Sequence, residues 1–315
     1  MNLNFMISKD VLQGPWAGLP VAWKKDLSFD EEAYRSDVAR TCAAGVPGVY
    51  TAGTTGEFYA MEFDEWKTIA RVTVDECRCA GTPVMIGVTS TYALGAARRA
   101  AFAAELGADA IQVALPFWMD IDDRMIMSFF QEVTGACPDM ALSIYETRRT
   151  KKMLTLEQHR AVFDFTAGSY LAVKSNEGTL GCSPEGCEQL SDFVNVWVGE
   201  DKWNALGPYG AVGSASALVY MNPRVILHMF DLLCRKQWDE LQPLTDQVSQ
   251  LIEEGLRPFA TQGFTDTGFD RLMGKASKFL TMNVRSRGTY ASATDEDVST
   301  LQKWMQENTP ELLLL

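Results

Sequence analysis

The feature that most constrains the fold of this chain is a regular alternation of short apolar runs and longer amphipathic segments. Runs with the composition of buried strands recur at spacings of roughly 20–35 residues, which is typical of βα units. They lie at 17–23, 46–52, 83–88, 110–115, 141–145, 170–174, 194–199 and 210–214. Helical patterns separate them, for example at 62–79 and 91–106. Eight such units predict an α/β fold whose parallel sheet closes into a (β/α)8 TIM barrel.

The order of side chains within the strands supports a closed barrel. In 170–174, Leu171 and Val173 share one face, while Tyr170, Ala172 and Lys174 share the other. An aliphatic face is suited to packing against outer helices, and a small, polar or aromatic face is suited to the interior of a barrel. The same division occurs in three other strands, at 110–115, 141–145 and 194–199.

The strand pattern stops near residue 235, and helical patterns follow at 237–254, 269–283 and 294–308. We therefore expect two parts: a barrel at 1–235 that carries the active site, and a helical extension at 236–315 that packs against it.

Charge and cysteine content narrow the class of protein. A formal net charge of −13 disfavours nucleic acid and anionic membranes as partners, although it leaves small anionic substrates open. The first residues, MNLNFMISKD, lack the basic and apolar regions of a secretory signal, and no stretch has the length of a membrane span. Seven cysteines, which we interpret as free thiols, fit a reducing compartment. These observations predict a cytoplasmic protein.

The chain contains only two histidines, His159 and His228, and both fall in helical surroundings. A histidine-rich metal site is therefore not expected, and the commonest general base is missing from the predicted strand ends. We expect chemistry that uses neither a metal nor a cofactor.

Lys174 stands at the end of the sixth predicted strand, on the inward face. Active sites of TIM barrels lie at the carboxyl ends of the strands. Loss of hydration there favours the neutral amine of a lysine, which is a nucleophile that condenses with a ketone to form a Schiff base. A salt-bridged lysine at the barrel rim, paired with Glu146 or Glu177, is the alternative.

Two further stretches lie at matching strand ends. Tyr145 ends the fifth predicted strand on the same face as Lys174, where its phenol can shuttle protons or simply pack. The second strand is followed by GTTGE at 53–57. Gly53 permits a tight turn with inward amides, and the hydroxyls of Thr54 and Thr55 allow the turn to hold a carboxylate. We expect Glu57 to brace this turn by accepting backbone hydrogen bonds.

With these residues the chain resembles the dihydrodipicolinate synthase and N-acetylneuraminate lyase family of Schiff-base aldolases. The motifs that carry the resemblance are GTTGE at 53–57, Tyr145 in YETRRT, Lys174 in AVKSNEG, and GAVGSASALVYMNP at 210–223. The resemblance implies pyruvate or another 2-oxo acid bound covalently to Lys174, Tyr145 as proton shuttle, and a homotetramer. It places Thr54 in the catalytic set and implies that Thr54 and Thr55 hold the carboxylate.

The same resemblance implies the remaining substrate contacts. In YETRRT the implied carboxylate-binding arginine is Arg149, with Arg148 as the rival, because this stretch is one residue shorter than in the family. The stretch GED at 199–201 places Gly199 and Glu200 where sugar-acid members bind the hydroxyl tail of their substrate. The glycine-rich turn that contains Gly213 and Ser214 is implied to contact substrate through its backbone.

The chain departs from the family's synthases after its fourth predicted strand, where LPFWMD has Phe117 and Trp118 in place of a relay tyrosine. Condensation of pyruvate with aspartate semialdehyde is therefore less expected than another lyase reaction. Trp118 and Trp203 suggest an apolar wall for an aromatic aldehyde, whereas GED suggests a 2-keto-3-deoxy sugar acid. We thus expect aldol cleavage, condensation or dehydration of a 2-oxo acid. The alternative is a catalytically inactive 2-oxo acid sensor or scaffold on the same barrel.

Overall fold

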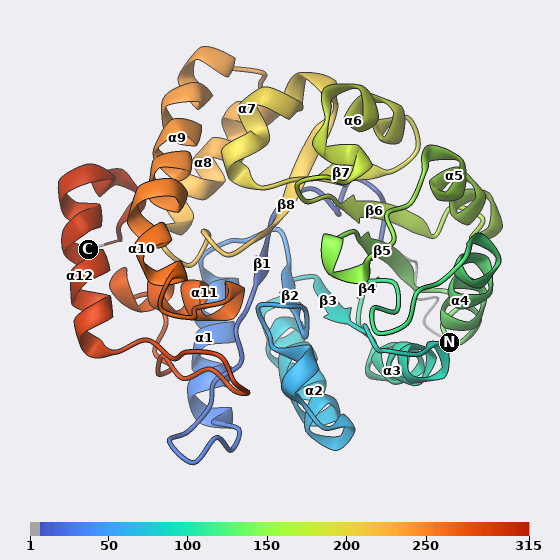
Figure 1. Ribbon diagram of the computed structural model, residues 1–315, viewed down its shortest axis with the longest axis horizontal. Helices are drawn as coiled ribbons and strands as arrows, with labels where there is room; N and C mark the ends of the chain where they lie inside the picture. Colours follow the sequence, from blue (N-terminus) through green and yellow to red (C-terminus); the bar gives the residue numbers. More distant parts are fainter. Residues whose placement is uncertain (1–6, 315) are drawn as a thin grey trace.

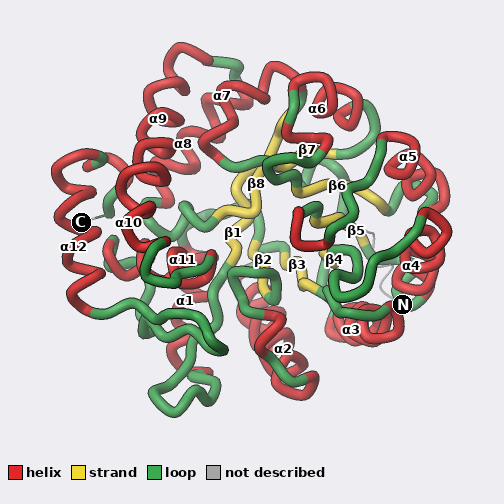
Figure 2. The backbone as a smooth tube through the Cα atoms, viewed as in Figure 1, coloured by secondary structure: helices red, strands yellow, loops and turns green. Residues whose placement is uncertain are grey.

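A computed structural model describes residues 7–314 and shows eight parallel strands in one closed barrel. In Figure 2 the strands lie at the centre and helices surround them. The strands are β1 (Gly14–Gly18), β2 (Val49–Thr51), β3 (Val84–Gly87), β4 (Ala110–Val113), β5 (Ala141–Tyr145), β6 (Tyr170–Lys174), β7 (Asn195–Trp197) and β8 (Ala211–Ser216). The ring closes because β1 pairs with both β2 and β8. The predicted (β/α)8 fold is confirmed.

Helices follow the strands in the expected order (Figure 1). Those of the barrel are α1 (Glu31–Ala43), α2 (Phe63–Ala80), α3 (Ala93–Leu106), α4 (Asp123–Gly135), α5 (Leu156–Phe165), α6 (Pro184–Ser191), α7 (Trp203–Leu206) and α8 (Pro223–Cys234). The C-terminal helices, drawn in orange to red, are α9 (Trp238–Gln250), α10 (Arg257–Ala260), α11 (Asp266–Ala276) and α12 (Asp295–Asn308). None of the helices in the described part of the chain is long and apolar enough to cross a membrane.

Two clusters of buried side chains reflect the two faces of the strands. The larger cluster fills the space between strands and helices and includes Val173 and Val196. The smaller cluster fills the barrel interior, where Trp16 and Trp197 pack with ring centroids 5.9 Å apart. Alternating side chains thus point alternately inward and outward, as the strand pattern predicts.

The strand β6 departs from strict alternation. Leu171 and Ala172 both belong to the interior cluster, whereas Tyr170 belongs to the outer cluster and its hydroxyl lies 2.8 Å from His159 Nδ1 on α5. The prediction that Tyr170 points inward is therefore wrong. The cause is a register irregularity opposite Leu142 and Ser143 of β5, where one extra residue of β6 is accommodated.

The helical extension is joined to the barrel mouth by α11. Arg271, fully buried, donates to the carbonyl of Val21 at 2.6 Å and to Glu57 Oε2 at 2.6 Å. Thr267 donates to the carbonyl of Thr55 at 2.8 Å. The helix α11 is therefore fixed over the turn that follows β2. The boundary predicted at 235/236 falls between α8 and α9 and stays a prediction as a division into domains.

Candidate active site

The predicted nucleophile and proton shuttle lie side by side. Tyr145 and Lys174 are register partners at the ends of β5 and β6. Lys174 Nζ lies 4.3 Å from the centroid of the Tyr145 ring. None of the ion pairs among residues 7–314 involves Lys174, and Glu146 instead faces His159, with Oε2 and Nε2 3.3 Å apart. The structure therefore brings Lys174 to Tyr145 and not to the two carboxylates considered as alternative partners.

The phenol of Tyr145 is buried and its oxygen lies 3.4 Å from the hydroxyl of Thr54. Burial alone would raise the pKa of Tyr145. The positive charge of Lys174 and the hydrogen bond with Thr54 outweigh burial, so the pKa is lower than that of an ordinary phenol. A buried phenol with a lowered pKa beside an amine is suited to proton transfer.

The GTTGE turn has its backbone amides available for a ligand. Within the described residues, the amides of Thr54 and Thr55 donate to no protein group, whereas the carbonyls of Gly53 and Thr54 accept from Phe58 and Glu57 at 3.3 Å and 3.0 Å. Gly53 is required here, because a β-carbon at this position would overlap the Tyr50 hydroxyl. Two free amides and two hydroxyls on one turn can bind a carboxylate.

Glu57 braces this turn more extensively than expected. Its carboxylate accepts from Trp23 Nε1 at 2.5 Å, from Arg271 Nη2 at 2.6 Å and from the backbone amide of Arg287 at 2.7 Å. Only the last of these is a backbone hydrogen bond of the kind that the sequence predicts. The turn is therefore held from both the N-terminal and the C-terminal parts of the chain.

A cavity of about 410 Å³ opens above Tyr145 and Thr54. Four aromatic side chains in its wall pack edge to face in a row. The ring centroids of Phe117 and Phe58 lie 6.2 Å apart, those of Phe58 and Tyr59 lie 5.6 Å apart, and those of Tyr59 and Tyr290 lie 5.5 Å apart. Trp118 and Trp203, which suggested an apolar wall, do not line this cavity. Trp118 is 75% exposed, and Trp203 is buried with its indole donating to the carbonyl of Gly213.

Of the two rival arginines, Arg149 lines the cavity and Arg148 does not. Arg149 Nη2 lies 2.9 Å from the carboxylate of Asp266 at the start of α11. The guanidinium of Arg148 lies against Gly178 instead. The geometry thus favours Arg149 for contact with a substrate.

Of the predicted site residues, Thr54, Tyr145 and Arg149 line the cavity. Those that do not line it are Gly53, Thr55, Lys174, Gly199, Glu200, Gly213 and Ser214, the last four of which lie after β7 and on β8. Glu200 is buried and accepts from the hydroxyl of Ser214 at 2.9 Å. A side chain at Gly213 would overlap the indole of Trp197, and one at Gly199 would overlap Asp201. In this structure these last four residues pack the loop that follows β7 and the strand β8, and their predicted contact with substrate stays a prediction.

One titratable group near the site was not anticipated from the sequence. Asp270, on α11, is 6% exposed, and burial raises the pKa of its carboxyl to about 7 despite the opposing effects of Thr55 and Lys174. Nothing in the local sequence indicates that this helix crosses the barrel mouth, so no pattern pointed to Asp270.

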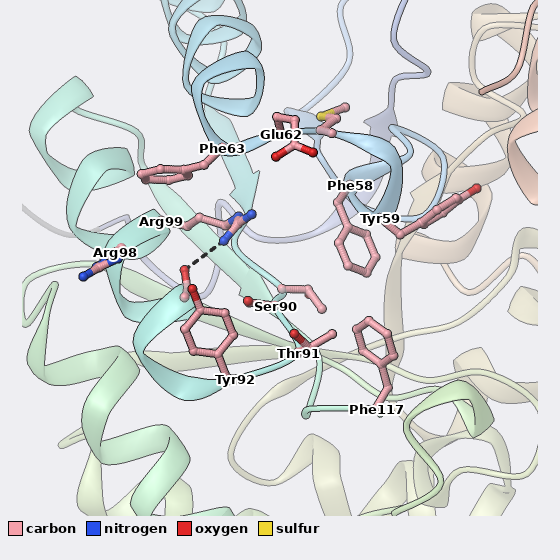
Figure 3. A pocket seen from close by; sticks show the side chains of 13 residues that line it. Phe58, Tyr59, Glu62, Phe63, Ser90, Thr91, Tyr92, Arg98, Arg99 and Phe117 are labelled. Atoms are coloured by element: carbon pink, nitrogen blue, oxygen red, sulfur yellow. Dashed lines mark hydrogen bonds between the residues drawn. The ribbon is translucent and has the colours of Figure 1, made fainter. Parts of the chain in front are cut away.

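A second hollow of about 500 Å³ adjoins the first between the starts of α2 and α3. The two share Thr89 and the aromatic residues Phe58, Tyr59 and Phe117. Figure 3 shows Phe58 and Phe117 facing each other at one side of this hollow, and Arg99 at its opposite side. The guanidinium of Arg99 lies over the Phe63 ring and donates to the carbonyl of Gly95 at 3.1 Å. The aromatic pair is thus common to both hollows.

Comparison with known proteins agrees with this geometry. The model of the dihydrodipicolinate synthetase family matches residues 12–263. The 4-hydroxy-tetrahydrodipicolinate synthase of Methanothrix thermoacetophila is 24% identical over 245 residues, which are 77% of this chain and 81% of that protein. The trans-O-hydroxybenzylidenepyruvate hydratase-aldolase of Pseudomonas aeruginosa is 25% identical over 152 residues, which are 46% of this chain and 45% of that protein.

A probable 5-dehydro-4-deoxyglucarate dehydratase of Bradyrhizobium is 31% identical over 133 residues, which are 42% of this chain and 40% of that protein. Among solved structures, YagE, a prophage protein of E. coli K12 in complex with pyruvate, has the same fold, with a TM-score of 0.82 at 18% identity over 94% of this chain and 98% of that one. The chain therefore belongs to the dihydrodipicolinate synthetase family and is an enzyme of its lyase class.

Proposed function

We propose that this enzyme forms a Schiff base between Lys174 and pyruvate or a related 2-oxo acid, and makes or breaks a carbon–carbon bond to an aromatic aldehyde. The observation that carries the proposal is the pairing of Lys174 with Tyr145, because Tyr145 lines a cavity with an aromatic wall. The free amides of Thr54 and Thr55 support binding of the 2-oxo acid carboxylate beside them.

The proposed chemistry needs only groups of this site. The neutral amine of Lys174 adds to C2 of the 2-oxo acid, and the resulting carbinolamine loses water to leave a protonated imine. Tyr145 donates the proton that the departing hydroxyl needs. In cleavage, the C3–C4 bond breaks and its electron pair moves toward the iminium to give an enamine. The C4 hydroxyl passes its proton to the Tyr145 oxygen and becomes the aldehyde carbonyl. Condensation is the reverse.

The cavity wall favours an aromatic aldehyde over a sugar acid. Four aromatic rings surround the space above Tyr145, and stacked or edge-to-face aromatic contacts contribute about 0.5–1.5 kcal/mol each beyond area burial. The carboxylate of Glu200, which suggested a polyhydroxylated substrate, is bonded to Ser214 and lies outside the cavity wall. A hydratase-aldolase is among the relatives of the chain, and its name is consistent with this choice. A sugar-acid dehydratase, also represented among the relatives, is the second candidate.

The synthase reaction itself is less well supported. Phe117 occupies the cavity wall and packs against Phe58, and it has no hydroxyl to complete a proton relay. We expect weak or no condensation of pyruvate with aspartate semialdehyde, and robust turnover in a coupled assay would contradict this expectation.

Covalent trapping tests the first half of the proposal. The enzyme is incubated with pyruvate, reduced with borohydride and measured as intact protein by mass spectrometry. One pyruvate-sized adduct is expected in the native enzyme and none in Lys174→Ala. Absence of an adduct with pyruvate and with a panel of other 2-oxo acids would refute the Schiff-base mechanism.

The second half is tested by turnover. The enzyme is supplied with pyruvate and either benzaldehyde-type or polyhydroxylated aldehydes, and product formation is followed by chromatography. Preference for the aromatic aldehyde supports the proposal. Preference for the sugar-derived aldehyde, or dehydration of a sugar acid, supports the second candidate. An adduct without turnover of any aldehyde or sugar acid supports a 2-oxo acid sensor.

Assembly and location belong to the same proposal. We expect a cytoplasmic homotetramer, as the family resemblance implies. Trp118 and Met119, which are 75% and 71% exposed beside the cavity, support a subunit contact there, because large apolar side chains gathered at a surface mark interaction sites. Light scattering after size exclusion checks the assembly, and a monomer at micromolar concentration would contradict it.

A further inference from the structure

The helix α11 presents one face to the GTTGE turn. Thr267 and Arg271 of this face bond to the carbonyl of Thr55 and to Glu57 respectively. Asp266, one helical turn before Asp270, pairs with Arg149 at the cavity. Asp270 lies between these contacts on the same face, so its carboxyl is directed at the turn and not at solvent.

The Asp270 carboxyl has an unused oxygen. Oδ2 is buried and has no hydrogen-bond partner among residues 7–314, and the buried hydroxyl of Tyr220, in the loop before α8, has none either. Buried polar atoms without partners are uncommon in folded proteins and indicate a missing ligand or water. The charged and titratable groups around Asp270 are Lys174 on β6, Asp266 and Arg271 on α11, and Tyr220.

We propose that Asp270 is a further substrate-binding residue, which donates a hydrogen bond from its protonated carboxyl to the carboxylate of the 2-oxo acid held at Thr54 and Thr55. This proposal rests on the proposed function. It adds that the enzyme takes up one proton at Asp270 when substrate binds above neutral pH.

The sign of the effect follows from the charges. An ionised Asp270 on α11 would face a carboxylate bound at the turn, and each negative charge would disfavour the other. The carboxyl has a pKa of about 7 in the free enzyme, so it is largely neutral at pH 6 and largely ionised at pH 8. Burial raises the pKa of Tyr220 well above its ordinary value, so this phenol stays neutral across the same range. Substrate binding therefore raises the proton affinity of Asp270 and weakens as pH rises above 7.

Calorimetric titration of the intact enzyme with pyruvate, at pH 6 and pH 8, tests the proposal. The matched variant is Asp270→Asn, whose amide donates a hydrogen bond at every pH. The ratio of their dissociation constants at each pH compares a carboxyl with an amide at this one position. The ratio of native to variant is expected to rise roughly tenfold from pH 6 to pH 8, as loss of one proton requires. Native enzyme at pH 8 should also take up close to one more proton than the variant, measured by repeating the titration in buffers of different ionisation heat.

The control is Asp109→Asn. Asp109 is a carboxyl whose pKa burial also raises, but it precedes β4 at the opposite end of the barrel and accepts from the amide of Val84. This variant should show the pH dependence of the native enzyme, and thermal denaturation verifies that both variants fold. An unchanged ratio at pH 6 and pH 8, or a folded Asp270→Asn protein that no longer binds pyruvate, would overturn the proposal while native binding upholds the proposed function. A native enzyme that binds no pyruvate at either pH would refute both.

Discussion

Replacement of Glu57 by glutamine should destabilise the enzyme well beyond what loss of one surface ion pair would do. Glu57 and Arg271 are both 0% exposed, and their atoms Oε2 and Nη2 lie 2.6 Å apart. In Glu57→Gln the guanidinium loses its only carboxylate partner among the described residues, and the new amide group places a donor next to the donors of Arg271 or Arg287.

The expected magnitude follows from burial. Removing one partner of a buried pair costs about 3–5 kcal/mol, because the other charge is left in a poorly hydrated place. Arg271 keeps the carbonyl of Val21 at 2.6 Å and its contacts with Thr267, so the lower part of this range is expected. For a chain of this size, about 3 kcal/mol corresponds to a fall of roughly 4–5 °C in the midpoint of thermal denaturation.

Urea denaturation followed by tryptophan fluorescence measures the change. Glu31→Gln is the matched control, because Glu31 pairs with Arg35 at 2.8 Å on the surface of α1, where such a pair contributes about 0.3–0.5 kcal/mol. The double variant Glu57→Gln/Arg271→Met removes both charges and should recover part of the loss. If Glu57→Gln costs no more than Glu31→Gln, then the carbonyl and hydroxyl partners alone satisfy Arg271, and the argument from the buried charge is wrong.

Two further predictions concern the site. Tyr145→Phe removes the hydroxyl that lies 3.4 Å from the hydroxyl of Thr54. In a folded protein this should slow both adduct formation and turnover by roughly 10²–10⁴-fold, as loss of a general acid–base does. Single-turnover trapping measures the rates, and unchanged rates would assign the proton transfer to another group. Phe117→Ala removes one ring of the Phe58–Phe117 pair, whose centroids lie 6.2 Å apart. It should lower kcat/KM for an aromatic aldehyde by about 2–12-fold more than kcat/KM for a small aliphatic aldehyde. Equal losses for the two aldehydes would show that the wall does not contact the aldehyde.

The barrel and the pairing of Tyr145 with Lys174 were predictable because they follow from the residue pattern within single strands. The bounds expected for β5 and β6 coincide with the structure, at 141–145 and 170–174, so the inward ends of these strands place Tyr145 beside Lys174. In contrast, β1 was expected at 17–23 and lies at Gly14–Gly18. The apolar run continues beyond the strand because Val21 and Trp23 are buried under Arg271 and Arg287 of the C-terminal part. Residues that are buried by contacts with a distant segment are as apolar as residues buried within a strand, so the sequence pattern of the two was the same.

The remaining errors have the same origin in long-range contact. Tyr170 faces outward because the irregularity between β5 and β6 depends on a pairing of two strands and leaves no mark on either one alone. Asp270 and Tyr290 reach the site from the helical extension, whose sequence gives helices but not the direction in which they cross the barrel. The aromatic wall was expected from Trp118 and Trp203, but it is built from residues on three separate segments.

The attachment of α11 to the turn after β2 also bears on how the chain acquires activity during synthesis. Glu57 and Arg271 are 214 residues apart in sequence, so all eight strands leave the ribosome before the cationic partner of Glu57 is made. Contacts of such separation form late, because the intervening chain must first be ordered. A nascent barrel can thus close around its core while Glu57 has its bond to Trp23 but lacks those to Arg271 and Arg287. The carboxylate binding proposed for this turn would then appear only when the last helices have docked, which ties the proposed activity to completion of the chain.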